Sequence, residues 1–293
     1  MIVTMIEKVY TFLWGDLVKI PLPGGSTLGI SLLILLLIPT GIYFTIRTKL
    51  LPIRLFPDMV RALSEKKSDK NNLSAFQTLI VSTATRVGMG NLVGVVAAIS
   101  AGGAGAVFWM WITALIGSST AFIEATLAQL YKEKDPLYGG YRGGPAYYIH
   151  RYWEEKQGRK RKKVLLSVLF AISGLICWCG ISQVISNSVT SAFHNAFHIP
   201  PIYTTVVLVA LAAVIIFRKT ATVKVLDVLV PVMAGCYFLL TVVLVAKNAA
   251  LLPSVFQRIF EEAFGLRQVV AGGFGAVLMN GVKRGLFSHE AGS

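Results

Sequence analysis

The sequence predicts an all-α polytopic membrane protein. Of its 293 residues 55% are hydrophobic and 14% are charged, whereas a soluble domain carries roughly 25% charged residues. The mean hydropathy is +0.66. A membrane-spanning helix needs about 20 mostly apolar residues. Six stretches meet this requirement and a seventh is diluted by glycine: 27–46, 74–101, 104–130, 164–192, 201–217 and 225–246, with the weaker one at 266–282.

The positive charge lies in alternate loops. The net charge is +14, and 22 of the 28 Lys and Arg residues fall in one set of loops against 5 in the other set. Such an asymmetry marks the cytoplasmic side of a membrane protein, so it predicts the topology and not a nucleic-acid partner. We expect the N-terminus outside and a multi-pass chain in the lipid bilayer. The basic loops are 47–73, 131–163, 218–224 and 283–293.

Two further segments are amphipathic, and neither is a predicted span. Residues 1–25 have no cleavable signal-peptide pattern and suit an interfacial helix, which with the first span makes a region 1–46. Residues 249–264 place apolar side chains on one face and predict an external interfacial helix. The three cysteines lie in apolar stretches, which favours small core residues over a disulfide or a metal framework.

The span at 74–101 is unusual because "STATRVGMGNLVGV" puts an arginine and three glycines at its centre. Its 28 residues would form a helix of about 42 Å, longer than the roughly 30 Å hydrocarbon core. Gly88 and Gly90 weaken the helix near its middle, and Asn91 adds a polar side chain. A break at membrane depth implies a polar cavity. Close helix packing is the alternative explanation of the glycines.

The seventh span repeats this pattern in "AGGFGAVLMNGV", Ala271 to Val282. Interrupted segments in corresponding places of two halves point to the midplane binding site of a transporter. If residues 74–246 form a first repeat of five helices, residues 266–293 open a second, incomplete repeat. Each repeat then begins with a glycine-broken helix.

Three motifs carry a family resemblance: "TRVGMGNLVGVVAAISAGGAGAVFWMWITALIGSSTAFIEATLAQLY", "YRGGPAYYI" and "GVKRGLFSHEAGS". Together they resemble the alanine or glycine:cation symporter family, sodium-coupled amino-acid carriers of prokaryotes. That family usually has threonine or a similar residue at position 89, where this chain has Met89, and "SNEAG" where this chain has "SHEAG". The resemblance implies a LeuT-like (APC-type) inverted-repeat fold, truncated here after the first helix of the second repeat.

The resemblance also implies a site. Free amides at Met89 and Gly90, beside Gly88, would bind the substrate carboxylate. Na⁺ would be the coupling ion, with no cofactor. The implied Na⁺ ligands are the carbonyls of Ala84 and Val87 and the side chain of Asn91. Asn91 is also an expected substrate contact. The remaining expected substrate contacts are Gln183, for which an interhelical hydrogen bond is the alternative, and Gly273 and Phe274 at the second break.

Arg86 needs a partner, because a charge at the centre of a membrane helix costs at least about 2.5 kcal/mol. Glu290 and Glu124 are the candidates. We expect a structural or gating ion pair, with direct binding of the substrate carboxylate as the alternative. His194 and His198 have the i, i+4 spacing of metal ligands but sit at the end of a span, which favours an interfacial pair.

These features predict a secondary active transporter in the plasma membrane of a prokaryote. It would carry alanine or glycine inward with Na⁺ by alternating access. The alternatives are a proton-coupled carrier, a channel and a non-functional fragment. No nucleophile elbow, phosphate loop or carboxylate pair indicates an enzyme.

Overall fold

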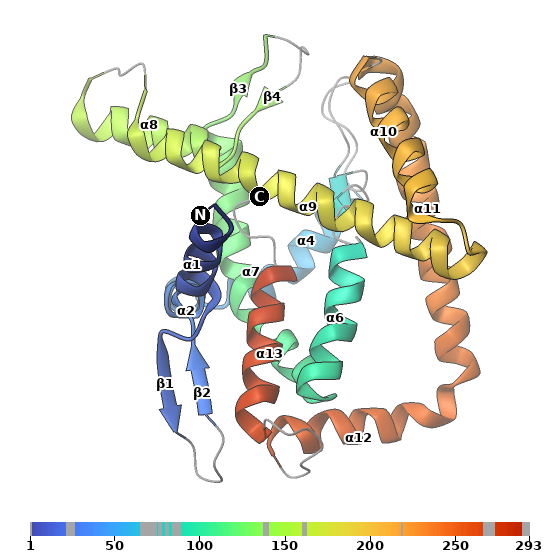
Figure 1. Cartoon of the computed structure of the whole chain (residues 1–293). Coiled ribbons are helices and arrows are strands. Elements are labelled where there is room, and N and C mark those ends of the chain that lie inside the picture. The colour runs from blue at the N-terminus through green and yellow to red at the C-terminus, as the bar shows by residue number, and fades with distance from the viewer. Residues whose placement is uncertain are drawn as a thin grey trace. The chain divides into compact units, whose positions relative to one another are not determined.

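The computed structural model describes residues 2–21, 27–64, 75, 78–79, 82–83, 89–136, 141–159, 163–217, 219–265 and 273–288. Most of these residues are helical (Figure 1). The chain divides into two compact units, and each is described by itself. The first unit contains residues 1–56, 95–176 and 254–293, and the second contains 57–94 and 177–253.

The N-terminal part of the first unit is a helix followed by a β-hairpin. Helix α1 covers Ile2–Trp14, and strands β1 (Val18–Pro21) and β2 (Thr27–Ile30) pair antiparallel. Helix α2 then runs from Leu32 to Arg47. The predicted first span, 27–46, was therefore wrong at its start, because its first four residues form a strand. A short apolar run such as "TLGI" does not distinguish strand from helix.

Helices α2, α7 (Ala106–Leu130) and α13 (Gly273–Ser288) pack together in the first unit. Small residues lie at these contacts, as is usual between membrane helices. A Cβ at Gly41 would lie 2.6 Å from Ile116, and the Thr45 hydroxyl donates to Ser119 Oγ at 3.1 Å. Ala106, at the start of α7, is fully buried.

A helix and a hairpin lie where the sequence indicated only loop. Strands β3 (Glu133–Lys134) and β4 (Tyr141–Arg142) pair, and α8 covers Pro145–Gln157. Within "GGPAYY" the signals of the helix start are Gly144, with φ of +112°, and a proline at the first helical position. The prediction of 131–163 as a basic loop between spans was therefore incomplete, because the segment contains a hairpin and a helix.

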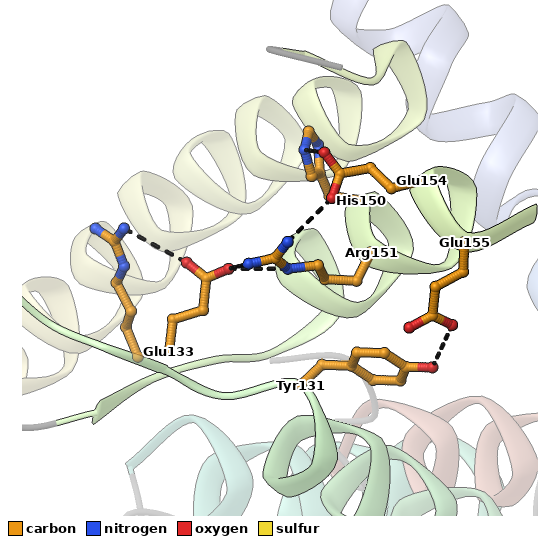
Figure 2. Close-up of polar contacts among 7 residues, drawn as sticks. Tyr131, Glu133, His150, Arg151, Glu154 and Glu155 are labelled. Carbon is orange, nitrogen blue, oxygen red and sulfur yellow. Dashed lines mark hydrogen bonds and ion pairs between the residues drawn. The ribbon is translucent and has the colours of Figure 1, made fainter. Parts of the chain in front are cut away.

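Charged groups join α8 to the hairpin and to the end of α7 (Figure 2). Glu133 bonds Arg151 at 2.5 Å, and Arg151 also bonds Glu154 at 3.1 Å. Tyr131, at the end of α7, donates to Glu155 at 3.1 Å. The hydrogen bond to Glu133 and then the charge of Glu133 raise the pKa of Arg151. The two ion pairs of Arg151 are partly exposed, so each contributes at most about 1 kcal/mol.

The other helices follow the predicted spans. Helix α6 covers Met89–Gly102, α9 covers Leu165–Phe197, α10 covers Pro201–Phe217 and α11 covers Lys219–Lys247. The short elements are α3 (Leu51–Arg54), α4 (Phe56–Leu63) and the 3₁₀ turn Ala249–Leu251, which precedes α12 (Leu252–Ala263). The helices predicted at 104–130, 164–192, 201–217, 225–246 and 249–264 are thus confirmed.

Within the described part of the chain, α7 and α9 are each long and apolar enough to cross a membrane. The consecutive helices Val232–Lys247 and Ala249–Ala263 meet the same test taken together. Helix α2 and the segments Gly90–Gly102 and Pro201–Ile215 are apolar but shorter. Among the described residues, fewer helices meet this test than the seven spans that the sequence predicts.

The prediction that the three cysteines are core residues was wrong. Cys177, Cys179 and Cys236 are free and exposed on α9 and α11. The apolar residues around them are exposed as well, among them Ile176 at 68% and Trp178 at 58%. Apolar surroundings in the sequence therefore reflect a surface and not burial.

Helix α13 also corrects the assignment of residues 283–293 to a basic loop. The helix continues to Ser288, and Lys283 within it bonds Asp16 at 2.9 Å. Gly281 lies against Ala106 and Gly285 against Thr113, so α13 runs in the same direction as α7. Helix α11 likewise begins at Lys219, inside the predicted basic loop 218–224. The segments 47–73 and 131–163 hold 17 of the 22 basic residues, which keeps the charge asymmetry.

The topology prediction can be tested on two exposed lysines. In otherwise cysteine-free protein, Lys156→Cys on α8 should resist an impermeant thiol reagent added to intact cells. Lys247→Cys at the end of α11 should react, because it lies in the set of loops poor in basic residues. Labelling of Lys156→Cys but not Lys247→Cys would reverse the orientation.

Candidate functional site

The first turn of α6 holds three of the predicted site residues. The helix begins at Met89, and Gly90 and Asn91 follow in the same turn. The amides of a first helical turn lack acceptors within the helix and carry partial positive charge. Asn91 is half-buried. Binding of a substrate carboxylate by this turn stays a prediction. Four predicted residues, Ala84, Arg86, Val87 and Gly88, lie outside the described residues.

Gly90 differs from the packing glycines of the same chain. No described atom lies within 4 Å of the position that a Cβ would take at Gly90. At Gly281 the corresponding position is 2.5 Å from the Ala106 carbonyl oxygen, and at Gly102 it is 3.0 Å from Asn280. Close helix packing therefore explains Gly102 and Gly281, whereas no described atom of another helix packs against the Cβ position at Gly90.

Helix α13 begins at Gly273, in a left-handed conformation with φ of +59°. Phe274 follows, and its ring packs on Trp109 of α7 with centroids 6.3 Å apart. The helix is continuous from Gly273 to Ser288, so any break in this span precedes Gly273. Residues 266–272 and Glu290 lie outside the described residues. Substrate binding by Gly273 and Phe274 stays a prediction.

Gln183 lines a pocket in the second unit. The pocket has a volume of about 530 Å³ and is lined by residues of α9 and α10. Its polar lining residues are Gln183, Ser186, Asn187, Thr190 and Thr205. The residues of the α6 turn are not among its lining residues, so this pocket does not join Gln183 to Gly90 or Asn91.

A buried carboxylate, Glu262, was not predicted. Its side chain is 2% exposed, and it accepts hydrogen bonds from the amides of Ala104 and Gly105 at 2.5 and 3.3 Å. Arg258 donates to its other oxygen at 2.6 Å, a bond that raises the pKa of Arg258. The glycine-rich turn "AGGAGA" before α7 is the only sequence signal of a close approach there.

Comparison with known proteins decides the family. The model of the sodium:alanine symporter family matches residues 23–293. The chain belongs to this family. It is 43% identical over 266 residues to the probable sodium/glutamine symporter GlnT of Bacillus subtilis, covering 89% of this chain and 54% of that protein.

Two further relatives are also named as amino-acid or alanine transporters. The amino-acid carrier protein AlsT of B. subtilis is 42% identical over 88% of this chain and 54% of its own length. The sodium/alanine symporter AgcS of Methanococcus maripaludis is 32% identical over 99% of this chain and 61% of its own length. The chain therefore spans little more than half the length of these relatives. They are transporters and not enzymes.

Two predicted features of this family member outside the α6 turn can be placed in part. Glu124 is half-buried on α7, and burial together with the charge of Glu124 raises the pKa of Tyr148 on α8. Its ion pair with Arg86 stays a prediction. The His194 ring nitrogen Nδ1 lies 3.1 Å from the carbonyl oxygen of Ile199, and the described residues contain no metal-binding group of three His, Cys, Asp or Glu side chains.

Proposed function

We propose that this symporter-family protein carries a small neutral amino acid, alanine or glycine, across the membrane together with Na⁺. Membership of the sodium:alanine symporter family is the observation on which this proposal depends. The start of α6 supports it, because Gly90 lies in the first turn of the helix and an added Cβ there would meet no described atom outside its own helix and chain neighbours within 4 Å. Alternating access in a LeuT-like inverted-repeat fold is the proposed mechanism.

In the proposed site each residue acts through its own chemistry. The amides of Met89 and Gly90 donate to the substrate carboxylate, and Gly88 keeps the approach free of a side chain. Oxygen ligands hold Na⁺: the carbonyls of Ala84 and Val87 and the amide oxygen of Asn91. The other proposed contacts come from Gln183, Gly273 and Phe274. Arg86, paired with Glu290 or Glu124, is the proposed gating or structural charge.

The coupling ion and the substrate have named alternatives among the relatives. A relative in B. subtilis, 41% identical, is called a putative sodium/proton-dependent alanine carrier, and GlnT carries glutamine in its name. Proton coupling is therefore the second candidate function. A larger substrate needs more space than alanine does.

Uptake of labelled alanine by proteoliposomes of the full-length protein tests the proposal. We expect uptake against a concentration gradient with an inward Na⁺ gradient, and competition by glycine but not by glutamine. Uptake driven by a pH gradient alone would assign proton coupling. Counterflow separates a carrier from a channel, because only a carrier exchanges internal alanine for labelled external alanine.

Asn91→Ala tests the proposed Na⁺ ligand. We expect the Na⁺ concentration for half-maximal alanine binding to rise roughly 10- to 100-fold, since a contact to a charged group contributes about 1.5–3 kcal/mol. The thermal stability of the Na⁺-free protein should stay near the wild-type value. An unchanged Na⁺ dependence in folded Asn91→Ala protein would exclude Asn91 as a ligand.

A further inference from the structure

The start of α7 is bonded to α12 through Glu262, a carboxylate with hydrogen bonds to both of its oxygens. Both oxygens of Glu262 are bonded, one to the Ala104 and Gly105 amides and the other to Arg258. The negative charge faces the N-terminus of α7, where the helix dipole favours it. Separating α12 from α7 would remove the two amide partners from this buried charge and leave only Arg258, which lies on α12 as well.

The contact between the start of α7 and the end of α12, here called the joint, depends on Gly105. A Cβ at Gly105 would lie 2.4 Å from the backbone nitrogen of Ala263 and 2.5 Å from the carbonyl carbon of Glu262. Only a residue without a side chain permits this approach of the two backbones. One turn further along α7, the Trp109 indole N–H donates to the Ala263 carbonyl at 3.1 Å.

Aromatic rings extend the joint along α12 and on to α13. Phe108 packs on Phe260 and Phe264 with ring centroids 5.6 and 5.1 Å apart. Trp109 contacts Phe264 at 6.4 Å and Phe274 of α13 at 6.3 Å. The start of α7 therefore contacts both the end of α12 and the beginning of α13, on either side of the segment that connects these two helices.

We propose that Glu262 is a positioning residue, which fixes α12 on the α6–α7 turn and thereby sets the start of α13, including Gly273 and Phe274. The joint stays closed throughout transport, so α12 and α7 move as one body and α12 is not a lid. This proposal rests on the proposed function, because it concerns the placement of two proposed substrate contacts.

Glu262→Gln in full-length protein in proteoliposomes tests the positioning role. The amide keeps the shape of the side chain but loses the charge that binds Arg258 and the two amides. We expect the KM for alanine to rise at least tenfold, with the maximal rate per folded molecule within threefold of wild type. A purely structural role would lower the amount of folded protein and leave KM unchanged, and that result would overturn the proposal.

Glu261→Gln is the matched control. Glu261 neighbours Glu262 on the same helix and accepts a hydrogen bond from Gln257 one turn back at 2.7 Å. We expect wild-type KM for this variant. An equal rise in KM for both variants would attribute the effect to the charge of α12 as a whole and would overturn the assignment to Glu262.

A cross-link tests whether α12 moves away from α7. Phe108→Cys and Phe260→Cys, joined by a short bifunctional thiol reagent in a background lacking Cys177, Cys179 and Cys236, should leave alanine uptake within twofold of the uncrosslinked protein. Uptake that stops on cross-linking would make α12 a moving lid and refute the proposal. If wild-type protein takes up no alanine with Na⁺, the proposed function fails. Wild-type uptake alone therefore distinguishes a failure of the proposed function from a failure of the Glu262 proposal.

Discussion

Gly90→Val should abolish alanine binding while the protein still inserts and folds. No described atom outside its own helix and chain neighbours lies within 4 Å of the position of an added Cβ at Gly90, so the valine side chain meets no packing contact among the described residues. If the substrate carboxylate binds the α6 amides beside Gly90, three added carbons exclude it. We expect affinity at least about 100-fold weaker, which corresponds to about 2.7 kcal/mol.

The measurement is the binding of labelled alanine to the monodisperse fraction after size-exclusion chromatography. Gly180→Val on α9 is the matched control, because Gly180 also has open space beside it and lies outside the proposed site. It should bind alanine as wild type does. Near-normal affinity in folded Gly90→Val protein would remove the carboxylate site from the start of α6.

The helices that the sequence predicted well are those with continuous apolar runs. Helix α10 matches the predicted 201–217 at both ends, because Pro201 suits a first helical position and Arg218 ends the run. The hairpin was missed because β2 has only four residues, too few for a periodicity. The helix α8 was missed because "GGPAYY" was interpreted as loop, although proline at the first position is a start signal.

The site was predictable only in part. Helix α6 begins at Met89, but residues 84–88 lie outside the described residues, so the break predicted from two glycines within three residues stays a prediction. Gln183 was correctly placed on a membrane helix, but its pocket partner Thr205 comes from a different helix and could not be inferred from spacing. Glu262 was missed because its burial depends on backbone amides 157 and 158 residues away in the chain.

Helix packing is the explanation that the sequence analysis kept open for glycines of this chain, and it makes the opposite prediction at Gly281. The position of a Cβ there is 2.5 Å from the Ala106 carbonyl oxygen and 2.6 Å from Trp109 Cβ. Both atoms are fixed, one in the backbone and one at the root of a side chain. Gly281→Ala therefore forces α13 away from α7.

We expect Gly281→Ala to cost about 2–3 kcal/mol, the upper part of the range for overpacking. For a chain of this size that lowers the melting temperature by roughly 5–10 °C. Size-exclusion chromatography after heating in detergent measures the shift. Gly180→Ala, the same change at an open helical position, should stay within about 1 kcal/mol of wild type, since alanine is the better helix former.

Alanine binding by Gly281→Ala protein that remains folded should stay within about tenfold of wild type, because Gly281 lies against α7 and is not among the proposed substrate contacts. Gly90→Val is therefore expected to lose alanine binding and keep its stability, whereas Gly281→Ala is expected to lose stability and keep alanine binding. A Gly281→Ala variant as stable as wild type would mean that α13 and α7 do not pack at this distance in the folded protein, and would remove the contact on which the positions of Trp109 and Phe274 depend.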